Sequence, residues 1–116
     1  MKILFLGDVV GISGCSKLMN NLMNEIELKN IDFVIVNGEN AASQGVGLTK
    51  EICHDFFNCG VNVITTGNHV WDQKEIMEYI DKEERLLVLK IFLNQHQVEV
   101  SIFIIPKMIL KLVYLI

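Results

Sequence analysis

Three short apolar runs, each ending in glycine and polar residues, constrain the fold of this chain more than any other feature. The runs and the residues that follow them are 2–6 with Gly7-Asp8, 32–36 with Asn37-Gly38-Glu39-Asn40, and 61–65 with Thr66-Gly67-Asn68-His69. Continuous apolar runs of this length are typical of strands that are buried on both faces of a parallel sheet. The sequence therefore predicts three buried strands that each carry polar side chains to their carboxyl end.

Helical patterns separate and follow these strands. Residues 15–28 carry apolar side chains at helical spacing, and residues 50–59 follow Thr49, which is a suitable N-cap. A third helix is expected over residues 72–80, with Asp72 as its cap. The alternation of strand and helix predicts an α/β fold, built from parallel β-α-β-α-β units with helices on the faces of the sheet.

The polar residues at the strand ends are the candidate site, because ligands of open α/β sheets bind beyond the carboxyl ends of the strands. These residues are Asp8, Glu39, Asn40, Asn68 and His69. Carboxylates, amide oxygens and imidazole suit hard divalent or ferrous ions, and a bridging carboxylate is common in two-metal hydrolytic sites. Each residue alone also fits a structural role, as a helix cap, a turn residue or a packed histidine. Their convergence on three consecutive strand ends favours a metal site.

Composition limits the partners and the compartment. The net charge is −4, and the bulk composition indicates neither nucleic acid nor an anionic membrane surface as a partner. The cysteines, Cys15, Cys53 and Cys59, are odd in number and lack metal-ligand spacing, which favours buried thiols in a reducing cytosol. The first residues, MKILFLGDVVG, do not resemble a signal peptide. We therefore expect a cytoplasmic protein.

Composition also changes along the chain. All eight glycines lie between Gly7 and Gly67, and Glu99 is the one acidic residue of 14 that follows Leu86. From Leu86 to Ile116, 21 of 31 residues are apolar. The two segments look like products of different selection.

Three segments carry a resemblance to a known family: GDVVG, NGENAASQGVGLT and TTGNHVWDQKEI. They resemble the first three motifs of the calcineurin-like metallophosphoesterases, and most closely those of the bacterial YmdB-like 2′,3′-cyclic-nucleotide 2′-phosphodiesterases. The resemblance covers Met1 to about Leu87. It implies the N-terminal part of a metallophosphoesterase sandwich. It also implies a small phosphodiester or cyclic nucleotide as substrate, with no nucleic-acid duplex or membrane as a partner.

The resemblance also assigns roles to the strand-end residues. It implies that Asp8 binds one metal ion, that Glu39 bridges two ions and that Asn68 binds the second. Asn40 would contact a metal-bound oxygen or the phosphate, and His69 would donate a proton to the leaving alkoxide. The two ions, iron, manganese or magnesium, would activate the attacking water.

The family pattern is incomplete in this sequence. The family takes three further histidines from the second half of a longer chain, whereas His54 and His96 are the only histidines here besides His69. In the family, a pair such as Leu86-Leu87 precedes Arg-Pro-x-Asn-Phe and then Pro-Gly-x-Gly. Codons compatible with residues 88–103, read one base out of frame, can encode both motifs in order and at the proper spacing.

We therefore expect residues 1–87 to be a partial metallophosphoesterase domain and residues 88–116 to be a frame-shifted tail without evolved function. The tail should pack little against the α/β part, and its segments SIFII and KLVYLI resemble aggregation-prone strands. The main functional hypothesis is a truncated relative of a two-metal phosphodiesterase, a pseudogene product that is inactive alone. One alternative is a small metal-binding or partner-binding module. Another is a protein anchored by residues 101–116, a segment shorter than the ~20 residues that span a membrane.

Overall fold

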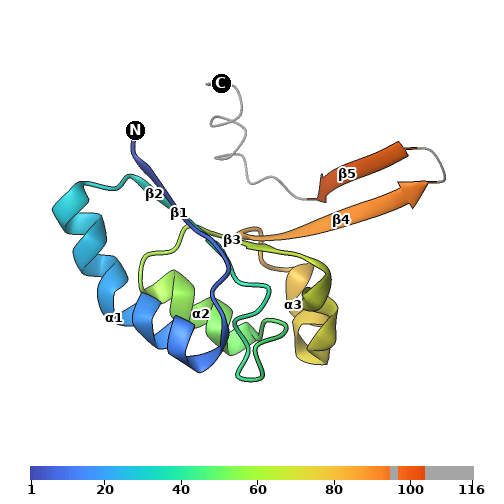
Figure 1. The fold of residues 1–116 in the computed structure, drawn as a ribbon, viewed down its shortest axis with the longest axis horizontal. Helices are drawn as coiled ribbons and strands as arrows, with labels where there is room; N and C mark the ends of the chain where they lie inside the picture. The colour runs from blue at the N-terminus through green and yellow to red at the C-terminus, as the bar shows by residue number, and fades with distance from the viewer. Residues whose placement is uncertain (95–96, 104–116) are drawn as a thin grey trace.

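The protein contains one five-stranded sheet (Figure 1) in the order β1-β2-β3-β4-β5. The structure, a computed structural model, describes residues 1–94 and 97–103. The strands are β1 (Ile3–Leu6), β2 (Phe33–Asn37), β3 (Val63–Thr66), β4 (Leu86–Asn94) and β5 (Gln97–Phe103). Strands β1 to β4 pair in parallel, and β5 pairs with β4 antiparallel. The expected α/β class, with three adjacent parallel strands, is confirmed.

The helices lie together on one side of the sheet (Figure 1). They are α1 (Gly11–Lys29), α2 (Lys50–Asn58) and α3 (Met77–Ile80). Their apolar sides bury the strand residues that point toward them, among which Val34, Val36 and Ile64 are at most 1% exposed. Phe56 of α2 is fully buried in the same core. Removal of this apolar surface from water is the main stabilising contribution to the fold.

The second helix begins where the sequence predicts. The Thr49 hydroxyl accepts a hydrogen bond from the Ile52 amide at 3.2 Å, so Thr49 is the N-cap. Gly60 follows the helix with a φ of +104°, a conformation that glycine adopts without steric cost.

The third expected helix is wrong as a single element. Residues between β3 and β4 form two 3₁₀ turns, η1 (Asn68–Asp72) and η2 (Lys74–Ile76), before the short helix α3. Asp72 ends η1 and does not cap a helix, because its carboxylate turns back toward His69. Gln73 takes the position before η2, and its side chain makes no capping hydrogen bond.

The opposite side of the sheet carries no helix in the part of the chain that the structure describes (Figure 1). Phe33, Val63 and Leu87 form a small cluster there. Ile3 and Phe5 of β1, by contrast, are 45% and 59% exposed. The sheet is therefore covered by helices on one face only.

Strand β4 extends well beyond its partner β3. It pairs with β3 through Leu86, Leu87 and Val88, and from Val88 onward it pairs with β5. The expected boundary after Leu87 and the expected poor packing of the tail stay predictions. The segment KLVYLI and the end of SIFII lie outside the described residues. Among the described residues, no helix is both long enough and apolar enough to cross a membrane.

Candidate functional site

Backbone hydrogen bonds join the segments that follow the first three strands. The Val9 amide donates to the Asn37 carbonyl at 3.0 Å, and the Gly11 amide donates to the Asn40 carbonyl at 2.9 Å. The Gly38 amide donates to the Thr65 carbonyl at 2.9 Å. These bonds hold the three strand-end segments together at the carboxyl end of the sheet, where the sequence places its candidate residues.

Asp8 and Asn40 are in direct contact. The Asn40 side-chain amide donates to Asp8 Oδ1 at 2.8 Å, across two loops that are 32 residues apart in sequence. Asp8 has a φ of +34°, which is uncommon for a residue other than glycine. Such conformations persist where the surroundings enforce them, and they are concentrated at functional sites. The first strand therefore presents an exposed carboxylate that the second strand's loop orients.

Glu39 reaches from the end of β2 to the end of β3. A Cβ atom built on Gly67 would lie 2.0 Å from Glu39 Oε2 and 2.9 Å from its Cδ. The φ of Gly67 is −130°, so a side chain here would meet the Glu39 carboxylate and not a backbone restriction. The Glu39 carboxylate consequently occupies the place of a side chain at Gly67, next in sequence to Asn68.

The glycine-rich loop after Glu39 folds back on it. The Gly47 amide donates to the Glu39 carbonyl at 2.7 Å, and Gly47 has a φ of +85°. The Gln73 side-chain amide donates to the Val46 carbonyl at 3.2 Å. Gln73 thus ties this loop to the segment that carries His69. Sequence reasoning did not select Gln73, since only the contact in space reveals its role.

His69 is oriented by Asp72. Its Nδ1 lies 2.8 Å from Asp72 Oδ2, and both side chains are about half exposed. With the proton on Nδ1, the imidazole donates to this carboxylate and Nε2 stays available at the surface. Sequence reasoning missed this positioning role of Asp72, which it interpreted as a helix cap.

The donor types fit a hard divalent cation, since they comprise two carboxylates, two amides and an imidazole. The structure pairs Asp8 with Asn40, places Glu39 against Gly67 and pairs His69 with Asp72. Within residues 1–94 and 97–103, no three His, Cys, Asp or Glu side chains are grouped as a metal site. Metal binding by these residues stays a prediction.

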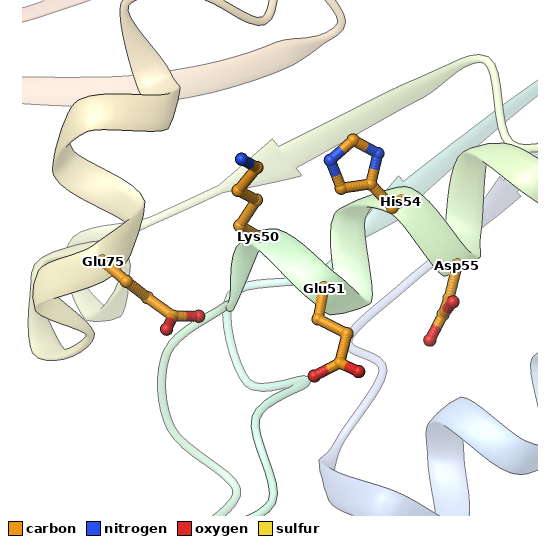
Figure 2. Close-up of a pocket in the computed structure, with 5 residues that line it drawn as sticks. All are labelled: Lys50, Glu51, His54, Asp55 and Glu75. Carbon is orange, nitrogen blue, oxygen red and sulfur yellow. The ribbon is translucent and has the colours of Figure 1, made fainter.

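His54, the other histidine among the described residues, lines a separate pocket. Lys50, Glu51, His54, Asp55 and Glu75 line a polar hollow of about 380 Å³ on α2 (Figure 2). The His54 ring lies 5.4 Å from the Tyr79 ring, and Lys50 Nζ lies 5.6 Å from that ring. Figure 2 shows the Glu51 and Asp55 carboxylates pointing away from His54, so these groups do not converge on one ligand.

The three cysteines form no disulfide and are all buried. Burial raises the pKa of the Cys53 thiol to about 12 and also raises the pKa of the other two thiols. The Cys15 thiol donates to the Ala41 carbonyl at 3.3 Å. These thiols are packing groups and not nucleophiles, because the reactive form of cysteine is the thiolate.

Comparisons with known proteins agree on one family. The model of the family described as YmdB-like protein matches residues 4–94. The 2′,3′-cyclic-nucleotide 2′-phosphodiesterase of Bacillus subtilis is 44% identical over 88 residues, which are 75% of this chain and 33% of that protein.

Two solved structures share the fold at 26% identity. A hypothetical protein from Thermus thermophilus gives a TM-score of 0.69, and the match covers 94% of this chain and 46% of that protein. A novel phosphatase from Mycoplasma pneumoniae gives a TM-score of 0.70, and the match covers 99% of this chain and 50% of that protein. The chain thus spans about a third of the curated relative and about half of the solved structures.

Proposed function

Because this chain belongs to the YmdB-like family, we propose that its strand-end residues form one half of a phosphodiesterase site. Asp8, Glu39 and Asn68 are the proposed ligands of divalent metal ions, namely iron, manganese or magnesium. Asn40 orients Asp8 and would contact the phosphate, while His69 would deliver a proton to the leaving oxygen. The metal ions, when bound, would supply an activated water and neutralise phosphate charge.

The position of Glu39 against Gly67 is the observation that carries this proposal. The Glu39 carboxylate fills the space of a side chain at Gly67 and is half-buried at the carboxyl end of the strands. This position brings the carboxylate of the loop after β2 to the end of β3, next in sequence to Asn68. That placement supports a bridging ligand.

A small phosphodiester is the proposed substrate class, and a cyclic nucleotide is the finer proposal. The name of the Bacillus subtilis relative supports the finer choice. The His69–Asp72 pair supports proton transfer, because the carboxylate fixes the ring and leaves the outer nitrogen available. The buried thiols support a reducing compartment, the cytoplasm.

We further propose that these 116 residues alone do not turn over phosphodiesters. The proposed site residues supply two carboxylates, two amides and one imidazole, no three His, Cys, Asp or Glu side chains of the described residues are grouped, and closed two-metal shells need more ligands. Misplacing reacting groups by about 1 Å already costs on the order of a hundredfold in rate. A general acid alone contributes about 10²–10⁴-fold, which does not offset the loss of a metal ion.

The test has two arms on the purified protein. Hydrolysis of a 2′,3′-cyclic nucleotide and of a chromogenic phosphodiester is measured with Mn²⁺ or Fe²⁺, beside Asp8→Ala, and no metal-dependent turnover is expected. Turnover that disappears in Asp8→Ala would disprove the proposed inactivity. In the second arm, Mn²⁺ should broaden the NMR signals of Asp8, Asn40 and Asn68 in the wild type. The absence of broadening at these residues would contradict the metal site itself.

A second candidate function is a partner-binding module. It is favoured by the outer edge of β1, where the sheet and α1 leave a groove open.

A further inference from the structure

The loop of residues 41–47 contacts the segments that follow both β1 and β3. On the β1 side, a Cβ atom built on Gly45 would lie 3.6 Å from Val10 Cγ1. On the β3 side, the Gln73 side-chain amide donates to the Val46 carbonyl at 3.2 Å. The loop therefore connects the segment that follows Asp8 with the segment that carries the proposed proton donor.

Main-chain hydrogen bonds fix the same loop to Glu39. The Gly47 amide donates to the Glu39 carbonyl at 2.7 Å, and the Ala42 amide donates to the Gly47 carbonyl at 2.9 Å. The Gly45 amide donates to the Ala42 carbonyl at 2.7 Å. These bonds close the loop on itself, so a displacement of Val46 and Gly47 is transmitted to the backbone of Glu39.

Gly47 lies directly against the segment that carries His69. A Cβ atom built on Gly47 would lie 2.6 Å from Gln73 Cγ and 3.2 Å from the His69 carbonyl oxygen. The φ of Gly47 is +85°, a conformation that residues with a side chain rarely adopt. Gln73, which lies between η1 and η2, thus packs on the loop and also hydrogen-bonds to it.

We propose that Gln73 is a positioning residue, which acts through the loop of residues 41–47 to fix the Glu39 carboxylate relative to Asn68 and His69. Glu39 has two supports, the Gly47 amide at its carbonyl and the space at Gly67 that its carboxylate fills. Gln73 holds the first support in place. The consequence for metal binding rests on the proposed function, because it takes Glu39 and Asn68 as ligands. Residues that orient metal ligands commonly change metal affinity when they are replaced.

Three variants separate the hydrogen bond from charge and from general stability. Gln73→Glu keeps the shape of the side chain but, when ionised, has no N–H to donate to Val46. Gln73→Leu removes the donor without adding charge. Gln44→Glu adds the same charge to an exposed residue of the loop itself and is the matched control.

The first arm of the test uses NMR on the purified full chain without metal. In both Gln73 variants, we expect the ¹³C shift of the Glu39 carboxyl to move and the Gly47 amide to exchange about fivefold faster. Both quantities should match the wild type in Gln44→Glu. A residue that only stabilises the fold would lower the melting temperature and leave the Glu39 shift of the folded chain unchanged.

The second arm adds Mn²⁺ and follows the NMR signals of Asp8 and Asn68. The Mn²⁺ concentration that broadens them by half should rise about tenfold in both Gln73 variants and stay unchanged in Gln44→Glu.

Three outcomes would overturn the proposal. They are a Glu39 shift that does not move in either Gln73 variant, a shift that moves equally in Gln44→Glu, and wild-type Mn²⁺ broadening that the Gln73 variants leave unchanged. If Mn²⁺ does not broaden the wild-type signals, the proposed metal site fails, and the Glu39 shift of the first arm still decides the role of Gln73.

Discussion

The two faces of the sheet carry apolar residues, but the exposure of these residues differs. Val34, Val36 and Ile64 point toward the helices and are at most 1% exposed, whereas Ile3 and Phe5 point the other way and are 45% and 59% exposed. Side chains alternate between the two faces along each strand. On β1 itself, Leu4 and Leu6 pack against the core on the helix side, whereas Ile3 and Phe5 lie on the other face. Apolar strand composition therefore indicates that both faces are suited to burial. The helices between the strands cover one face along β1 to β3. On the other face Phe33, Val63 and Leu87 are buried, and the exposed residues are those of β1.

The largest test of this contrast compares two phenylalanines. Phe56→Ala removes a fully buried ring from the helix-covered core and should lower the free energy of unfolding by about 3–5 kcal/mol. Phe5→Ala removes a ring that is mostly in solvent and should cost less than about 1 kcal/mol. Urea unfolding monitored by circular dichroism measures both changes. Similar losses for the two variants would show that the open face is already part of the core.

An intermediate effect is expected at Glu83 and Arg85, which directly precede β4. Arg85 Nε and Nη2 each donate to Glu83 at 2.8 Å, and these hydrogen bonds lower the pKa of Glu83 to about 2. Because the folded pKa lies below the ordinary value of 4.5, the stabilisation is complete above about pH 5. It is lost as the pH falls toward 2.

The pH dependence can be measured by thermal unfolding between pH 7 and pH 2. Glu83→Gln should cost on the order of 1–2 kcal/mol at pH 7 and almost nothing at pH 2. The exposed neighbour Glu84, changed to Gln, is the control. A constant difference between Glu83→Gln and wild type across this range would rule out the carboxylate as the source.

The smallest effect on stability separates a crowded glycine from an open one. Gly67→Ala places a methyl group on the Glu39 carboxylate, which can swing aside, so the free energy of unfolding should fall by about 1 kcal/mol or less. Gly7→Ala meets its nearest atom at 4.0 Å and should change little. The ¹³C shift of the Glu39 carboxyl should move in Gly67→Ala and not in Gly7→Ala. An unmoved shift in both variants would contradict the proposed position of Glu39.

Much of the covered half of the fold follows from local sequence. The three apolar runs mark β1 to β3 within one or two residues at each end, because a buried parallel strand needs no partner-specific signal. Helix α1 starts at Gly11, earlier than the expected residue 15. Glycines are poor helix formers, so Gly11 and Gly14 disguise its first turn. A Cβ atom on Gly14 would lie only 3.2 Å from a methyl carbon of Val9, so glycine fits this close approach.

Other parts depend on contacts that local patterns do not contain. The segment 68–80 is helical in type but breaks into three pieces, since Asp72 bonds to His69 instead of capping a helix. Local patterns did not predict that Leu86 to Val88 pair with β3. Such a pairing depends on residues far apart in sequence, as Ile64 and its partner Leu86 are 22 residues apart. At the site, the residue types were evident from the strand ends. The space that Glu39 occupies at Gly67 is visible only in three dimensions.

The order of strands in the sheet has a consequence for how the chain is made. Because the order β1-β2-β3-β4-β5 equals the order of synthesis, each strand can join the growing edge as it leaves the ribosome, without waiting for a later segment. Assembly in this direction needs only neighbouring units, which keeps the sequence separation of contacts low and favours rapid folding. The starting edge, β1, is never enclosed by this process. Whatever joins it must arrive last, after the rest of the sheet has a fixed shape.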